Sequence, residues 1–199
     1  MRKDAPTERE LRSCLSHFAT GVTIVTYEVD GQRFGVTVNS FTSVSLNPPL
    51  ILACLHKNAQ AAMLLRKRPF TVNVLAATQR DHALHFSGRP QPNLDLKFRE
   101  TPNGPRLEHC LAYINCEPWR VYDAGDHVIV LGYVCDIEMT GEKPLLFYRG
   151  EFRAIGDLLF DSAGPSDALA DEALRPLVSA GGGQEWSDDG YEVLLHRSW

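Results

Sequence analysis

The sequence predicts a mainly β protein with flanking helices, arranged as an antiparallel barrel. Six to seven runs rich in Val, Ile, Thr and Phe are separated by turn residues, and only short helical patterns lie between them. A doubly wound parallel sheet requires a helix after almost every strand, and this chain does not supply them. The 199 residues, 44% of them hydrophobic and 23% charged, suit one globular domain with a short extension.

The first predicted element is a helix that begins after Thr7. Thr7 and Glu10 have the spacing of a capping box, in which each side chain bonds the backbone of the other. We expect Gly21 to end the helix. One apolar face follows at helical spacing and consists of Leu11, Cys14, Leu15 and Phe18.

The strands begin after this helix. The runs 22–29 and 34–45 flank Asp30-Gly31, which is a strong hairpin signal between β-rich segments. The continuous apolar run 50–56 predicts a buried strand. Further strands are expected at 70–75, 110–121, 127–139 and 145–155.

Two short helices and one irregular segment interrupt the strands. Asn58 is the expected N-cap of a helix that runs to Arg68, and Thr78 is the expected N-cap of a helix that runs to Phe86. Residues 87–107 contain four prolines and two glycines, which predicts an irregular excursion.

Charge divides the chain into a body, 1–156, and an acidic extension, 157–199. The extension holds nine acidic and two basic side chains, so the net charge of −5 hides a mildly basic body. Such a body suits an anionic small molecule, whereas a nucleic-acid binder has a concentrated basic stripe. The extension is either a solvated segment or is anchored on the barrel or a partner subunit by Trp186, Tyr191 and Trp199.

Cysteine and hydropathy patterns predict a cytoplasmic protein without a membrane segment. No run of eighteen apolar residues and no signal-peptide pattern is found in the sequence. The thiols lack the paired spacing of disulfide or zinc sites, so we expect reduced and mostly buried side chains at Cys14, Cys54, Cys110, Cys116 and Cys135. His82 and His85 share a helix face, but two histidines alone make no closed metal site.

The segment 35–45 is unusually polar for a β-rich run. Its hydroxyl and amide groups suit an edge strand followed by a turn, which composition alone favours, and they also suit a ligand cradle that bonds a heterocycle or a phosphate without net charge. Lys57, Asn58 and Gln60 follow the next predicted strand at a helix start, where unpaired N–H groups favour an anion. Most strand-to-helix turns bind nothing, so composition leaves both alternatives open.

Five motifs in register resemble the short-chain flavin reductases, the reductase components of two-component flavin-dependent monooxygenases. The motifs cover residues 8–155 and follow one another in the family order. The first two are F-A-T-G-V-T at 18–23 and G-x-T-x-N-S-F-x-S-x-S with N-P-P-L at 35–50. The other three are F-x-V-N-V-L with Gln at 70–79, G-D-H at 125–127 and P-L-L-x-Y-R-G at 144–150. The resemblance implies a split β-barrel of the Greek-key, FMN-binding type. It also implies a homodimer with flavin bound at the subunit interface.

The resemblance further implies hydride transfer from NADH or NADPH to free FAD or FMN, which then leaves reduced for a separate monooxygenase. FAD and NADH are the favoured pair. A flavin carrier without reductase activity and a flavoprotein oxidase of the same barrel class remain alternatives.

The resemblance assigns roles to individual residues. His127 is expected at the nicotinamide, and it is the one residue expected to be catalytic. The flavin ring and ribityl chain would meet Thr37, Val38, Asn39, Ser40, Ser43, Val44 and Ser45. The flavin phosphates would meet Cys54, Leu55, Lys57, Asn58, Ala59 and Gln60. Another side would be closed by Phe86 and Ser87, and the pyridine nucleotide would meet Tyr148, Arg149, Gly150 and Glu151.

Three of these assignments have competing explanations in the sequence. Ala59 replaces the Ser or Thr that is common in the family, so only its backbone N–H is available to a phosphate. Arg149 also suits a surface ion pair. His127 also suits an ordinary position at the start of a strand.

Overall fold

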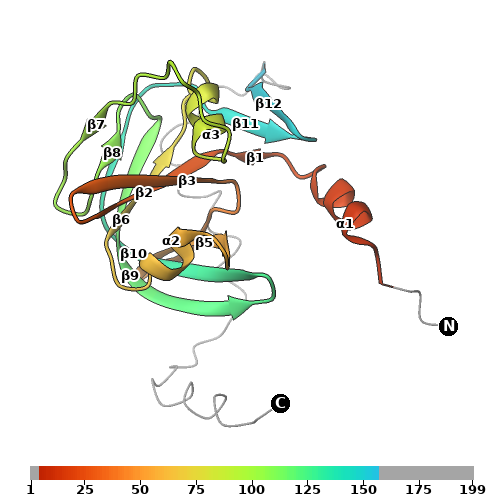
Figure 1. Cartoon of the computed structure of the whole chain (residues 1–199), viewed down its shortest axis with the longest axis horizontal. Coiled ribbons are helices and arrows are strands. Elements are labelled where there is room, and N and C mark those ends of the chain that lie inside the picture. Colours follow the sequence, from red (N-terminus) through yellow and green to blue (C-terminus); the bar gives the residue numbers. More distant parts are fainter. Residues whose placement is uncertain (1–4, 157–199) are drawn as a thin grey trace, which may run out of the picture. The chain divides into compact units, whose positions relative to one another are not determined.

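A computed structural model describes residues 5–156, and the extension predicted at 157–199 lies outside the described residues. Helix α1 (Glu8–Leu15) precedes a body of strands, with α2 (Gln60–Leu64) and α3 (Arg80–His85) between them (Figure 1). The mainly β class predicted from the sequence is confirmed. None of the helices in the described part is long and apolar enough to cross a membrane.

The main sheet is antiparallel and strongly curved, with the strand order β3-β2-β6-β9-β10-β5-β4. It is formed by β2 (Thr23–Val29), β3 (Gln32–Val38), β4 (Thr42–Leu46), β5 (Pro49–His56), β6 (Phe70–Val74), β9 (Ala112–Ala124) and β10 (His127–Met139). The short strand β1 (Thr20–Gly21) extends the smaller sheet made by β11 (Leu145–Tyr148) and β12 (Glu151–Ala154). The irregular excursion contains only the two-residue strands β7 (Phe98–Arg99) and β8 (Arg106–Leu107).

Several predicted boundaries are wrong, and two of the breaks lie where the chain is bonded to distant segments, Ser40 to Cys54 and Arg149 to Ser16. The run 34–45 is two strands separated by a turn at 39–41, and the run 145–155 is a hairpin whose turn lies at Arg149-Gly150. Neither Asn58 nor Thr78 caps a helix: α2 and α3 begin after Ala59 and Gln79, which make no side-chain cap bond. Helix α1 ends at Leu15 rather than at Gly21, although its capping box is present as predicted.

Two apolar clusters fill the body. One lies on the inner face of the main sheet, where Val25, Leu55 and Phe70 are among its buried side chains. The second lies under α3 and β11, around Ile24, Leu75 and Leu107. Cys110 and Cys116 are buried as predicted, but Cys14 and Cys135 are exposed, so the expectation of mostly buried thiols is wrong for these two.

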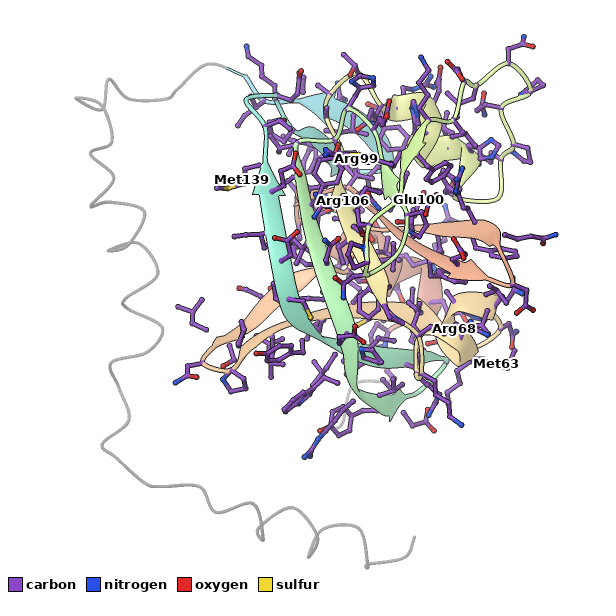
Figure 2. The ribbon with its side chains drawn as sticks, turned by 90° about the vertical axis from the view of Figure 1, so that its left-hand side faces the viewer. Met63, Arg68, Arg99, Glu100, Arg106 and Met139 are labelled. Atoms are coloured by element: carbon purple, nitrogen blue, oxygen red, sulfur yellow. The ribbon has the colours of Figure 1, made fainter. Side chains whose placement is uncertain are left out.

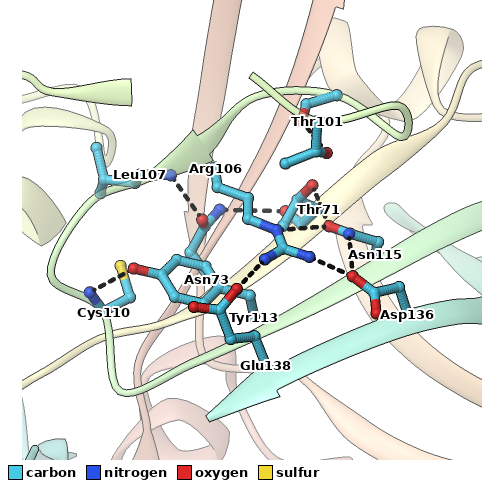
Figure 3. Close-up of polar contacts among 11 residues, drawn as sticks. Thr71, Asn73, Thr101, Arg106, Leu107, Cys110, Tyr113, Asn115, Asp136 and Glu138 are labelled. Carbon is cyan, nitrogen blue, oxygen red and sulfur yellow. Dashed lines mark hydrogen bonds and ion pairs between the residues drawn. The ribbon is translucent and has the colours of Figure 1, made fainter. Parts of the chain in front are cut away.

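A buried polar network fastens the irregular excursion to the sheet (Figure 3). The Arg106 guanidinium pairs with Glu138 at 2.5 Å and also with Asp136, and it donates to Asn115 Oδ1 at 3.3 Å. Asn73 Oδ1 accepts the backbone N–H of Leu107 at 2.8 Å. Arg106, Asn73 and Asn115 each have hydrogen-bond partners in this network, which is what makes buried polar side chains tolerable inside a core.

Candidate functional site

A pocket of about 300 Å³ opens between the end of β3, the end of α3 and the β11–β12 hairpin. Polar groups and apolar walls share its lining, as in most small-molecule sites. Its lining residues are Val22, Thr37, Asn39, Ala83, Leu84, Ser87, Arg89, Phe147, Gly150 and Phe152.

The end of α3 is bonded directly to the edge strand β3. The Thr37 N–H donates to the Phe86 carbonyl at 3.1 Å, and the Thr37 hydroxyl donates to the Ala83 carbonyl at 2.8 Å. Gly35 makes the close approach possible, because a Cβ at this position would lie 2.8 Å from the Phe86 ring. These contacts set Phe86 and Ser87 beside the polar end of β3.

The opposite wall is the β11–β12 hairpin. Arg149 and Gly150 form its turn, with φ values of 51° and 82°. The Arg149 N–H donates to the Ser16 carbonyl at 2.9 Å, and the Tyr148 ring meets the His17 ring edge-on at 6.5 Å between centroids. The turn is thereby joined to the end of α1. Glu151 pairs with Arg153.

The turn after β3 is also bonded to β5. It joins β3 to β4, the two edges of the main sheet. The Ser40 hydroxyl donates to the Cys54 carbonyl at 2.9 Å and accepts the Cys54 N–H at 3.1 Å, which continues the pairing of β4 with β5. Burial raises the pKa of the Cys54 thiol, which favours its neutral form.

Two residues beyond Cys54, at the end of β5, a cluster of polar side chains forms a corner with the start of β10. The His56 and His127 rings lie 5.3 Å apart at 77°. His127 Nδ1 lies 2.7 Å from Asp126 Oδ1, and this hydrogen bond lowers the pKa of the Asp126 carboxyl. His56 Nδ1 accepts the Asn58 N–H at 3.2 Å, so neutral His56 carries its proton on Nε2.

The turn after β5 uses its backbone N–H groups internally. Lys57 N–H donates to the Asp126 carbonyl at 3.0 Å, and Ala59 N–H donates to the His56 carbonyl at 2.8 Å. The Ala59 N–H is thus bonded within the protein, and its contact with a phosphate stays a prediction. The charge that remains at this turn is the Lys57 ammonium, which pairs with Asp123.

The matching family model is a flavin reductase like domain, and it covers residues 15–156. The chain belongs to this family. The flavin reductase-like chain is 40% identical over 156 residues to the reductase subunit HsaB of a flavin-dependent monooxygenase from Rhodococcus jostii (strain RHA1), covering 76% of this chain and 80% of that protein.

Solved structures of flavin reductases share its fold, which agrees with the split barrel predicted from the sequence. Flavin reductase PheA2 in its native state has a TM-score of 0.73 and 34% identity, covering 76% of this chain and all (100%) of that one. The NADH:FAD oxidoreductase SgcE6 of Streptomyces globisporus C-1027, in complex with NAD and FAD fragments, has a TM-score of 0.71 and 34% identity, covering 80% and 100%.

In this flavin reductase-like chain, ten of the predicted site residues gather in three places. Four of them, Thr37, Asn39, Ser87 and Gly150, line the pocket. Lys57, Asn58 and His127 lie at the corner. Ser43, Val44 and Ser45 lie on the edge strand β4, where the Val44 side chain is exposed.

Some residues that line the pocket were not predicted from the sequence, and the side chain of one predicted site residue is buried. Leu55 is 2% exposed inside the core, so its side chain is not available to a ligand. Phe147, Phe152 and Arg89 line the pocket but were not predicted. His56 was not predicted either, although alternation along β5 and the pairing of β5 with β10 set it opposite His127.

Proposed function

We propose that this protein is an NADH-dependent flavin reductase that transfers a hydride from NADH to free FAD or FMN. The reduced flavin then serves a separate monooxygenase. The observation that carries the proposal is the pocket, because it gathers residues from three segments of the chain that the motifs assign to flavin and nucleotide. The family membership and the names of the relatives support the same chemistry.

The chemistry of the pocket suits a flavin ring. Phe147 and Phe152 meet edge-on at 5.3 Å and supply an apolar wall. Asn39 supplies amide groups that bond a heterocycle rim without net charge. A bound flavin supplies the redox chemistry by accepting the hydride, while the protein orients the ring and the donor and excludes water.

The corner suits the nucleotide end of the reaction. Since Nδ1 of His127 is bonded to Asp126, Nε2 is the ring nitrogen that faces a ligand, and we assign it to the nicotinamide. Arg149, whose backbone is held by Ser16, is assigned to the pyridine nucleotide. Ser40 lies between the two regions. It is bonded to Cys54, and the extended chain covers only roughly 10 Å from Cys54 to Lys57.

A homodimer in the cytoplasm is part of this proposal. Large apolar side chains are exposed on β4, β9 and β10, and the Trp119 and Tyr133 rings stack at 5.9 Å between centroids. Exposed apolar area of this kind marks an interaction surface. Besides Trp119 and Tyr133, it includes Val44, Leu46, Ile137 and Met139.

The direct test is oxidation of NADH by catalytic amounts of the protein with free FAD or FMN, followed by the loss of reduced-nicotinamide absorbance. Flavin-dependent oxidation with multiple turnovers supports the proposal. No oxidation of NADH or NADPH with either flavin rejects it, and tightly bound flavin without turnover would favour a carrier. Light scattering checks the dimer.

A further inference from the structure

Arg89 is the only charged side chain among the described residues that line the pocket assigned above to the flavin ring, and no motif gives it a role. The other lining residues are apolar or carry uncharged polar groups. Within residues 5–156, the Arg89 guanidinium forms no ion pair. Its positive charge is therefore available to a molecule that enters the pocket.

The end of α3 holds the backbone of Arg89 in place. Gly88 has a φ of 85°, in the left-handed region, and the Arg89 N–H donates to the Leu84 carbonyl at 3.1 Å. A bond to the carbonyl five positions earlier is typical of a helix that ends on a glycine. The Arg89 carbonyl also accepts the Gln91 side-chain amide at 2.8 Å. The Arg89 side chain therefore starts from a fixed backbone position.

This position is fixed relative to the rest of the pocket as well. The Thr37 hydroxyl and N–H are bonded to the carbonyls of Ala83 and Phe86, so α3 is attached to the strand that precedes Asn39. The β11–β12 hairpin lies on the other side of α3's end and completes the lining (Figure 1). One cation and several neutral hydrogen-bonding groups thus share one small volume.

Hydride transfer changes the charge of a flavin ring. A hydride carries two electrons and one proton: the C4–H bond of the nicotinamide breaks, an N–H bond forms at flavin N5, and NADH becomes NAD⁺. The ring thereby gains one negative charge. A cation beside the ring stabilises this developing charge and has little effect on the neutral oxidised ring, which is the condition for faster transfer.

We propose that Arg89 is a catalytic residue that stabilises the negative charge gained by the flavin ring on hydride transfer. The inference rests on the proposed function, because that function sets the flavin ring in this pocket. Asn39 is neutral and binds both redox states of the ring, whereas Arg89 distinguishes between them. The Arg89 residue is exposed, so water screens its charge and the expected effect is modest.

The affinities for oxidised and reduced FMN test the proposal without turnover. Arg89→Met keeps an extended side chain and removes the charge. We expect the dissociation constant for reduced FMN, measured without oxygen, to rise roughly five-fold and that for oxidised FMN to rise less than about two-fold. A five-fold difference lowers the midpoint potential of bound FMN by about 20 mV, because tenfold corresponds to about 30 mV for two electrons. Spectroelectrochemical titration measures this potential.

Two further variants separate charge from structure. Arg89→Lys keeps the charge and should restore the selectivity for reduced FMN. Arg80→Met is the matched control, because Arg80 begins α3, is paired with Asp81 and does not line the pocket. We expect this control to bind both redox states like the unmodified protein. Thermal unfolding checks that all three variants remain folded.

Selective weakening of reduced FMN binding in Arg89→Met, with restoration in Arg89→Lys, supports the proposal. Equal weakening for both redox states, no weakening, no restoration by lysine, or the same selective loss in Arg80→Met overturns it. Failure of the proposed function would show as no NADH or NADPH oxidation by the unmodified protein with either flavin. If the unmodified protein turns over and the potential ignores Arg89, only the role of Arg89 is contradicted.

Discussion

Asn39 is a polar side chain that the fold itself does not use. It lines the pocket at the end of β3, and its amide makes no hydrogen bond within residues 5–156. Its neighbour Ser40, by contrast, is occupied with Cys54. Adjacent residues of one motif thus have different surroundings: Asn39 lines the pocket, and Ser40 is bonded to β5.

Asn39→Ala should weaken flavin binding by about 1 kcal/mol, the net value of one hydrogen bond, and leave thermal stability unchanged. Quenching of flavin fluorescence on titration measures the affinity. Thr42→Ala, on the exposed face of β4, is the control and should bind flavin normally. Equal affinity in the Asn39 variant would remove this residue from the flavin site.

His56 should be a positioning residue for the turn at 57–59, through the bond from the Asn58 N–H to Nδ1. Asparagine presents an oxygen near the Nδ1 position, whereas glutamine presents its amide near Nε2. We expect His56→Asn to keep the KM for NADH within about two-fold of the value of the unmodified protein. His56→Gln should raise the KM for NADH roughly five-fold. The reverse order would contradict a role for Nδ1.

The five thiols should react in three classes. Cys14 and Cys135 are exposed, Cys54 is half-buried, and burial raises the pKa of Cys110 and of Cys116 to about 12. Since the thiolate is the reactive form, a thiol reagent at neutral pH should modify two groups rapidly and a third slowly. The last two should react only after unfolding by denaturant. Rapid modification of all five would show that the core opens readily.

At the scale of elements, α3 and β3 act as one unit. The backbone bond from Thr37 to Phe86 and the close contact at Gly35 hold the end of the helix against the strand. The unit forms one side of the pocket, so its geometry controls the spacing between Asn39 and Ser87.

Gly35→Ala should push the end of α3 away from β3, because the new methyl group would lie 2.8 Å from two atoms of the Phe86 ring. We expect a loss of stability of about 1–2 kcal/mol from overpacking and a clear rise in the dissociation constant for flavin. Thermal unfolding and flavin titration measure the two effects. Gly141→Ala, where a Cβ meets nothing within 4 Å, is the control. Unchanged flavin affinity in Gly35→Ala would mean that Phe86 does not shape the site.

Sequence patterns predicted the elements well and their ends poorly. Asp30-Gly31 and the β-rich runs located the first hairpin because turn chemistry is local. The run 34–45 contains a break that its composition does not reveal. The turn at Asn39 and Ser40 is stabilised by hydrogen bonds between Ser40 and Cys54, which is distant in sequence. Likewise, no local signal separates a long last strand from the hairpin at Arg149, whose turn is held by Ser16.

At the scale of the whole molecule, the site depends on contacts between distant parts of the chain. The motifs predicted Thr37, Ser87 and Gly150 as site residues in separate segments of the sequence. The fold brings these three residues together in one pocket. His56 was beyond sequence analysis for the same reason, since its importance comes from its pairing with His127 across two strands. Resemblance therefore supplied most of the candidate residues, and the fold supplied their grouping.

Arg106 should contribute more to stability than any exposed arginine near it. Its side chain is 7% exposed, while its partners Asp136 and Glu138 are 57% and 46% exposed (Figures 2 and 3). Arg106→Ala removes charged hydrogen bonds and should cost about 2–3 kcal/mol, below the value for a fully buried pair because water reaches both carboxylates. Denaturant unfolding measures this. Arg99→Ala, nearby and exposed, should change stability by less than about 0.5 kcal/mol. Equal losses would contradict the assigned role of the network.

The two bonds between Ser40 and Cys54 hold the turn after β3 against β5, next to the pocket residues Thr37 and Asn39. If these bonds break, the turn is free to move away from β5. A ligand in the pocket that contacts the turn would stabilise it, so hydrogen–deuterium exchange at the Cys54 amide should slow when the ligand binds. The same serine then reports both the occupancy of the pocket and the integrity of the connection between β3 and β4.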